Sequence, residues 1–165
     1  MLFQTYEFGF GQGPGLEAHG GSSYCSVASL ALMDRLSSLT AGQRHNVTRW
    51  LLRRQHDGFQ GRPNKPVDTC YSFWVGAALK ILGAFDFVDV KRNKLYIFST
   101  QDTAVGGFSK WTETTPDPMH TYMGLAGLSL MGYPGLGEVM PLLNITQRAH
   151  AHLKNLHVAW HRRRL

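Results

Sequence analysis

Apolar and polar segments alternate along this chain with the periodicity of helices. Three segments are apolar on nearly every side, which is typical of helices that are buried on most faces. These segments are Ser22–Leu39, Asp68–Gly83 and Asp117–Met131. A more polar segment with a single apolar stripe follows each of them, at Gln43–His56, at Val90–Gln101 and from Glu138 onward. Because no segment alternates with a period of two and no Asn-Gly turn occurs, the pattern predicts an all-α fold.

A unit of 49 residues occurs three times. Phenylalanine follows glycine at positions 10, 59 and 108, and alanine recurs with the same spacing at 28, 77 and 126. Each unit therefore contains a Gly-rich loop, an apolar helix and a more polar helix. Repeated αα-hairpins of this length form either an open solenoid or a closed ring. In a ring the apolar helices form the inner wall, and the loops carrying His19, Asp68 and Asp117 gather at one mouth.

One group of side chains at this mouth suits a metal ion. Asp68 and Cys70 lie at the start of the second apolar segment, and His120 lies one position from Cys70 in the repeat register. A carboxylate, a thiolate and an imidazole form a plausible zinc set, and three protein ligands leave a fourth position open, as in catalytic sites. The alternative is structural, with Cys70 as a small buried apolar residue and His120 as a helix N-terminal residue.

A second group is cationic. His19, Arg62, Lys65 and Tyr71 supply three potential cations and a hydroxyl close to the same mouth. Such a set surrounds an anionic group such as a phosphate well. The alternative is that these side chains cap loops and face solvent.

Large aromatic residues lie on the apolar helices. Tyr24, Phe73 and Trp74 are core residues in the simpler interpretation. In a ring, inward-facing aromatics could instead line a cavity for a long apolar ligand. The Gly-rich segment Gly9–Gly21 lacks the Gly-Lys-Ser/Thr ending of a phosphate loop, and no nucleophile elbow occurs.

Composition limits the class of protein. The 165 residues, 43% apolar and 17% charged, fit one globular domain over residues 1–165. No apolar run reaches the roughly 18 residues of a membrane span, no signal peptide is apparent, and the two cysteines fit a reducing compartment. The net charge of +6 includes a basic tail, 161–165, after a last helix over Gln147–Trp160. Nucleic acid is not an expected partner, because no basic helix face alternates with exposed aromatics.

Five segments of this chain resemble the β subunits of protein prenyltransferases. They are Glu17–Gly21, Gly61–Trp74, Ser99–Asp102, Gly106–Phe108 and Asp117–Leu130, and Gly61–Trp74 is highly specific. The resemblance runs from about Tyr6 to Ile145. It implies an α/α toroid, here a partial ring, that pairs with a separate helical α subunit.

The resemblance also implies a role for individual residues. One zinc ion would be bound by Asp68, Cys70 and His120. The diphosphate of an isoprenoid would be held by His19, Arg62, Lys65, Tyr71 and Lys110. The pocket for the isoprenoid chain would be lined by Tyr24, Cys25 and Trp74. The zinc ligands, together with Tyr71 and Lys110, would form the catalytic set.

One position separates the branches of the family. Farnesyltransferase-like chains carry an aspartate ten residues before the zinc histidine, where it helps to bind magnesium, and this chain has Lys110 there. A lysine neutralises the leaving diphosphate without a divalent ion, which implies type I geranylgeranyl transfer with no magnesium requirement. Met119 and Met123 stand where the farnesyl enzyme carries tyrosines, and less bulk there is compatible with a twenty-carbon chain.

The implied reaction is alkylation of a cysteine in the cytoplasm. Geranylgeranyl diphosphate would donate its isoprenoid to C-terminal Cys-a-a-X motifs in which X is Leu or Phe, in proteins such as small GTPases. The chain is expected to be about half of a β subunit that lacks its N-terminal repeats, and a half ring would expose two apolar edges. The alternatives are a truncated, non-catalytic zinc- or isoprenoid-binding module and a farnesyltransferase-like β subunit. A terpene cyclase is disfavoured because no Asp-rich acid motif occurs.

Overall fold

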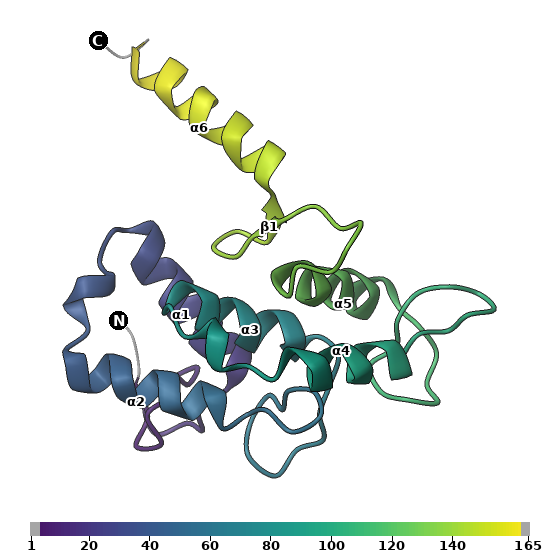
Figure 1. Ribbon diagram of the computed structural model, residues 1–165. Coiled ribbons are helices and arrows are strands. Elements are labelled where there is room, and N and C mark those ends of the chain that lie inside the picture. Colours follow the sequence, from purple (N-terminus) through teal and green to yellow (C-terminus); the bar gives the residue numbers. More distant parts are fainter. Residues whose placement is uncertain (1–3, 163–165) are drawn as a thin grey trace.

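The computed structural model describes residues 4–162, and its regular structure is mainly helical (Figure 1). The α-helices are α1 (Gly20–Leu32), α2 (Ala41–Leu52), α3 (Tyr71–Ile81), α4 (Val90–Ser99), α5 (Pro118–Leu130) and α6 (Gln147–Arg162). Two 3-10 turns, η1 (Leu36–Ser38) and η2 (Phe85–Phe87), precede α2 and α4, and the antiparallel strands β1 (Val139–Met140) and β2 (Ile145–Thr146) precede α6. Of the expected basic tail, residues 163–165 lie outside the described part of the chain.

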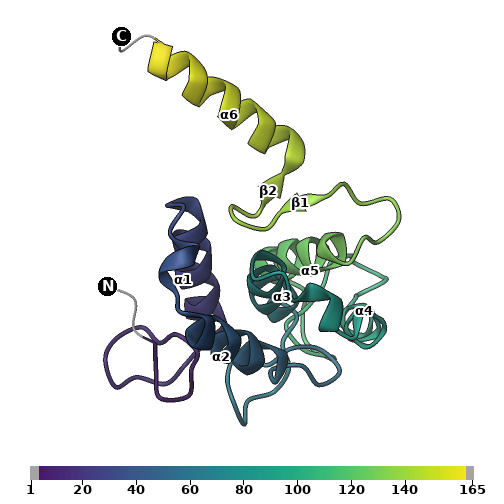
Figure 2. The ribbon, with the colours of Figure 1, turned by 60° about the vertical axis from the view of Figure 1, so that its left-hand side comes forward.

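The three apolar helices form the inner row of the molecule (Figure 2). Helix α3 packs against α1 on one side and against α5 on the other, while α2 and α4 contact the row from outside. A close approach between α3 and α5 occurs at Gly127, where a Cβ atom would lie 2.8 Å from the Cβ of Ser72. Glycine at this position therefore allows the two helices to pack at short distance.

The three repeats share one loop geometry. The phenylalanines at positions 10, 59 and 108 are buried, with exposures of 1%, 0% and 5%. The carbonyl oxygen of each accepts a hydrogen bond from the backbone N–H nine residues later. These donors are His19, Asp68 and Asp117, at 3.0, 3.0 and 3.3 Å. The predicted repeat register is therefore confirmed, and it places the three equivalent residues just before the inner helices.

Several helix boundaries differ from the sequence-based prediction. The first apolar helix ends at Leu32 instead of Leu39, because Asp34 has a left-handed backbone (φ 55°) and η1 follows. The second begins at Tyr71 instead of Asp68, because residues 68–70 form a turn whose carbonyl oxygens accept from the N–H groups three residues later, at 3.1, 3.2 and 3.1 Å. Hydrogen-bonded loop geometry thus shortens the helices at the ends where the apolar pattern continues.

The prediction of a helix starting at Glu138 is wrong. Residues 139–146 form the β1–β2 hairpin, and only from Gln147 does α6 follow. Gly132 and Gly135 have positive φ angles of 64° and 88° and turn the chain away from α5. Ser129 Oγ then donates to the Gly137 carbonyl (2.7 Å) and accepts from the Val139 N–H (2.8 Å). The strands have two residues each, too short for a recognisable period-two pattern.

Helix α6 projects away from the other helices (Figure 1). It packs against the β1–β2 hairpin, and none of its residues is buried. None of the described helices is both long enough and apolar enough to cross a membrane.

Candidate metal and anion site

Asp68, Cys70 and His120 converge at the N-terminal ends of α3 and α5. One ligand atom from each side chain lies within 4.8 Å of the other two. The three residues are buried, with exposures of 7%, 6% and 5%. The repeat explains this convergence, because it places the loop before α3 beside the first turn of α5.

Asp117 fixes the orientation of the His120 ring. Its carboxylate caps α5 by accepting from the His120 backbone N–H (2.9 Å), and its second oxygen lies 2.5 Å from His120 Nδ1. The Nδ1–H group donates to Asp117, so Nε2 is the ring nitrogen that faces the other two side chains of the cluster. Nε2 lies 3.3 Å from Asp68 Oδ1 and has no hydrogen-bond partner among the described residues. A histidine held by a carboxylate with its other nitrogen free is the usual arrangement of a metal ligand.

Thr69 joins this cluster to the neighbouring loop. Its side chain is fully buried, and Oγ1 donates to the Ser109 carbonyl at 2.7 Å. Its N–H donates to the Lys110 carbonyl at 3.2 Å. The same loop brings Lys110 Nζ to 3.8 Å from Asp68 Oδ2. Sequence reasoning missed the roles of both Thr69 and Asp117. Two signals pointed to Asp117, namely its place at the mouth in the repeat register and its helix-capping position directly before Pro118.

The donor set fits a zinc ion. Burial, and then the adjacent Asp68 carboxylate, raise the pKa of the Cys70 thiol above its usual range. A thiolate at this position therefore needs a nearby cation. Sulfur, imidazole nitrogen and carboxylate oxygen are the donors that zinc accepts, and the unpartnered Nε2 atom of His120 supplies one of them.

The five predicted diphosphate residues line one cavity of about 350 Å³ next to the metal cluster. They are His19, Arg62, Lys65, Tyr71 and Lys110, and Asp68 lines the same cavity. Arg62 Nη1 also pairs with Glu17 Oε2 at 2.8 Å. The structure thus brings these residues together, and their role as diphosphate ligands stays a prediction.

His19 and Tyr71 form a polar pair in the wall of this cavity. The His19 Nδ1 atom accepts from the Gly21 N–H (3.1 Å), so Nε2 carries the proton of the neutral ring and donates to the Tyr71 oxygen at 2.8 Å. Burial, and then Arg62, lower the pKa of His19, which favours this neutral form. Burial raises the pKa of Tyr71 to about 12, so its hydroxyl keeps a proton to donate. At Gly61 a Cβ atom would overlap the Tyr71 ring.

The predicted isoprenoid residues lie along the inner helices. The rings of Tyr24 and Trp74 pack with centroids 5.2 Å apart, and the Tyr24 hydroxyl donates to the Pro141 carbonyl (2.9 Å). Cys25 is exposed. Of the two predicted specificity residues, Met119 is 51% exposed and Met123 is buried at 9%.

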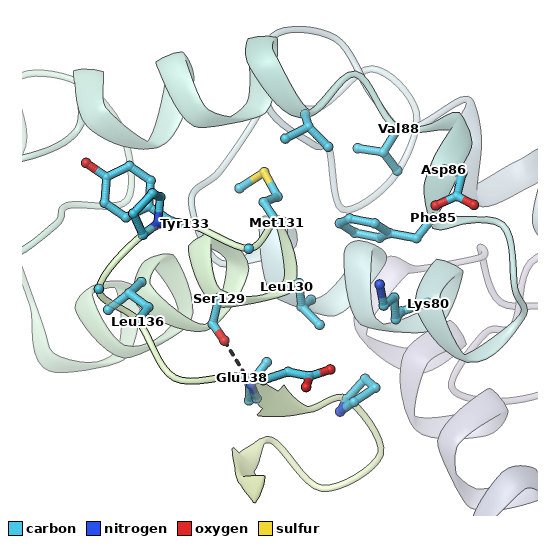
Figure 3. Close-up of a pocket in the computed structure, with 16 residues that line it drawn as sticks. Lys80, Phe85, Asp86, Val88, Ser129, Leu130, Met131, Tyr133, Leu136 and Glu138 are labelled. Carbon is cyan, nitrogen blue, oxygen red and sulfur yellow. Dashed lines mark hydrogen bonds between the residues drawn. The ribbon is translucent and has the colours of Figure 1, made fainter.

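A larger cavity lies at the C-terminal ends of α3 and α5 (Figure 3). Its volume is about 770 Å³, and its wall includes Lys80, Phe85, Leu130 and Glu138. None of the predicted site residues lines it. The chemistry-bearing side chains therefore gather around the smaller cavity at the N-terminal ends of these helices.

The chain belongs to the prenyltransferase α/α-toroid family. The family model of the prenyltransferase alpha-alpha toroid domain matches residues 1–145, which confirms the predicted fold class. The chain is 45% identical over 145 residues to the geranylgeranyl transferase type-1 subunit beta of Dictyostelium discoideum, covering 88% of this chain and 41% of that protein. It is 41% identical over 152 residues to the subunit of the same name from Arabidopsis thaliana, covering 86% and 40%.

A solved structure shares this fold. Protein geranylgeranyltransferase-I of Candida albicans, complexed with GGPP, matches with a TM-score of 0.83 and 32% sequence identity. The match covers 91% of this chain and 46% of that one. The chain therefore spans less than half the length of these relatives.

Proposed function

We propose that this chain carries the zinc- and diphosphate-binding part of a type I geranylgeranyltransferase β subunit. The supporting observation is that the metal cluster and the cationic cavity are contiguous. Asp68 belongs to both, with its oxygens 3.3 Å from His120 Nε2 and 3.8 Å from Lys110 Nζ. A thiol activated at the cluster would thus lie beside the carbon that carries the diphosphate.

The cationic cavity stabilises the leaving group. The S–C1 bond of a thioether forms while the C1–O bond to diphosphate breaks, and the departing anion gathers negative charge. Arg62, Lys65 and Lys110 neutralise this charge, and the Tyr71 hydroxyl donates a hydrogen bond to it. The neutral His19 ring keeps that hydroxyl oriented, because its Nε2–H is already bonded to the phenol oxygen.

Asp68, Cys70 and His120 would hold the zinc ion. Zinc, when bound there, lowers the pKa of the acceptor cysteine and so supplies a thiolate near neutral pH. Asp117 keeps the His120 ring in the tautomer that this role requires. The acceptor would be a C-terminal Cys-a-a-X motif with Leu or Phe at X, as in small GTPases.

Lys110 and the inner helices favour a geranylgeranyl donor. A lysine beside Asp68 provides the positive charge that magnesium would otherwise provide, so magnesium is not required. Tyr24, Cys25 and Trp74 would contact the isoprenoid chain, and Met119 and Met123 would leave room for its length. A separate α subunit would complete the enzyme in the cytoplasm.

A second candidate function is a binding module without catalysis. It is favoured by one observation, that this chain by itself brings together Asp68, Cys70 and His120 and lines the adjacent cationic cavity. Under this alternative the zinc and diphosphate sites bind their ligands, but no transfer to a peptide follows.

A transfer assay separates the two functions. The chain, with and without a prenyltransferase α subunit, is incubated with geranylgeranyl diphosphate and a Cys-a-a-Leu peptide, and thioether formation is followed by mass spectrometry. Turnover that disappears in Cys70→Ala supports catalysis. Zinc and pyrophosphate binding without turnover supports the binding module, and absence of all three contradicts both.

A further inference from the structure

A second polar cavity lies behind the loop that carries Arg62 and Lys65. Its volume is about 280 Å³, slightly below the range of about 300–1,000 Å³ for pockets that hold drug-sized ligands. Its wall includes Glu7, Arg49, Trp50, Arg53, Arg54 and Pro63. None of the residues assigned to zinc or diphosphate lines it, so it is a separate site.

Three polar atoms in residues of this wall have no hydrogen-bond partner within residues 4–162. They are Glu7 Oε2, Trp50 Nε1 and Arg54 Nη1, and all three are shielded from solvent. Trp50 and Arg54 are themselves buried, with exposures of 5% and 8%. Buried polar groups without a partner are rare in native proteins, so three in one wall indicate a group that binds there.

The buried arginine is held in place for such a group. Arg54 Nε donates to the Trp50 carbonyl at 3.3 Å, and its guanidinium carbon lies 4.8 Å from the centre of the Trp50 ring. These contacts fix the side chain but leave Nη1 without a hydrogen-bond partner in the described part of the chain. Arg49 and Arg53 are more accessible residues of the same wall, so three guanidinium groups oppose one carboxylate, Glu7.

We propose that this cavity binds hydrogen phosphate. Its deprotonated oxygens would accept from Trp50 Nε1–H and the Arg54 guanidinium, and Arg49 and Arg53 would neutralise its charge. Its remaining P–OH group would donate to Glu7 Oε2. Sulfate is nearly the same size but carries no proton at neutral pH, so it would meet the Glu7 carboxylate without a hydrogen bond. The carboxylate therefore makes the site selective for phosphate over sulfate.

The test compares the two anions. Thermal unfolding and calorimetry are carried out at pH 7 with inorganic phosphate or sulfate at equal ionic strength, and glycerol 3-phosphate shows whether a phosphomonoester is also accepted. Phosphate is expected to raise the unfolding temperature more than sulfate does, because both anions stabilise proteins through exclusion from the surface but only phosphate binds in this cavity. Arg54→Met is expected to weaken phosphate binding about tenfold or more, the effect of losing a charged hydrogen bond. Glu7→Gln is expected to reduce the preference for phosphate over sulfate, because the glutamine amide can donate a hydrogen bond to sulfate.

Two further variants keep the result interpretable. If Arg54→Met fails to fold, Arg53→Gln takes its place. Arg53 is exposed, so this exchange should lower phosphate affinity without disturbing the core. The double variant Arg62→Gln/Lys65→Gln removes cations of the diphosphate cavity and is expected to keep the phosphate response. Equal responses to phosphate and sulfate in this double variant, or no response to either, overturn the proposal. If the phosphate response is lost only in the double variant, phosphate binds in the diphosphate cavity. That result also overturns the proposal.

Discussion

At the scale of single residues, the candidate site depends on atoms left free by their neighbours. His120 Nε2 is available because Nδ1 is bonded to Asp117, and the Tyr71 hydroxyl is available because His19 donates to its oxygen. Burial raises the pKa of the Cys70 thiol, so that side chain ionises only beside a cation. His120 Nε2 and the Cys70 sulfur are therefore suited to a cation, and the Tyr71 hydroxyl is suited to an anion.

Removal of the Cys70 thiol should abolish tight zinc binding. Loss of a carboxylate that orients a metal ligand weakens metal binding about 10–100-fold, so the zinc affinity of Asp117→Asn should fall by that factor. The zinc affinity of Cys70→Ala, which loses a ligand, should fall further. Zinc affinity is measured by competition with a chromophoric chelator. Cys25→Ala is the matched control, because Cys25 is exposed and should leave zinc affinity unchanged. Equal zinc binding by Cys70→Ala and the wild type would rule out the site.

Replacement of Lys110 by aspartate should introduce a magnesium requirement. The exchange removes the cation 3.8 Å from Asp68 Oδ2 and supplies a carboxylate that suits magnesium. Transfer by the Lys110→Asp chain, assayed with a prenyltransferase α subunit, should be weak without magnesium and rise as magnesium is added, whereas the wild type should not respond. Lys110→Ala is the control, because it removes the positive charge without adding a carboxylate that could bind magnesium. A flat magnesium titration for Lys110→Asp contradicts the role of this residue.

At the scale of elements, the site is created by packing between helices of successive repeats. Helix α3 and the loop before it bring Asp68 and Cys70, α5 brings His120, and the two helices pack closely at Gly127. Any change that separates α3 from α5 therefore changes the distances within the metal cluster.

Substitution of Gly127 by alanine should destabilise the protein and the metal site together. The new Cβ atom would lie 2.8 Å from Ser72 Cβ, and overpacking of this kind costs about 1–3 kcal/mol. Denaturant unfolding should therefore shift to lower concentration, and zinc affinity should fall. Gly42→Ala is the matched control, because Gly42 lies in α2 with no atom within 4 Å of a new Cβ. A stability of Gly127→Ala equal to that of the control would contradict the packing argument.

At the scale of the whole molecule, charge is concentrated where anions are proposed to bind. The net charge is +6, and two separate cavities contain clusters of arginine or lysine. Exposed apolar residues also remain, including Leu32 and Met33 at the C-terminal end of α1 and Tyr122 on α5, at 52%, 59% and 50%. Apolar surface of α1 and α5 is therefore open in the described part of the chain.

Pyrophosphate binding should weaken strongly with salt. An increase in ionic strength from about 0.01 M to about 1 M shortens the Debye length from about 30 Å to about 3 Å. Because the cavity cations are partly exposed, pyrophosphate affinity should fall about tenfold or more over this range. Lys65→Gln should bind more weakly at low salt and show a shallower dependence, whereas Lys154→Gln on α6 should match the wild type. An affinity independent of salt would contradict the electrostatic role of the cavity.

The sequence alone determined the helical class, the 49-residue register and the residue types at the mouth. These properties follow from local periodicity and from spacing, which the order of residues records directly. The register also explains why spacing alone was enough to pair His120 with Cys70. Sequence reasoning failed where local hydrogen bonds end a helix, as at Asp34, and where the β1–β2 hairpin replaces a predicted helix.

Only the tertiary structure decided which atoms face one another. It showed that Asp117 orients His120 and that Thr69 ties the cluster to the Lys110 loop. It also showed that Arg54 is buried with a nitrogen that has no hydrogen-bond partner among residues 4–162. These facts depend on distances between residues far apart in the chain and on the exclusion of water. Periodicity cannot report either quantity, because the same apolar and polar pattern is compatible with many arrangements of the side chains.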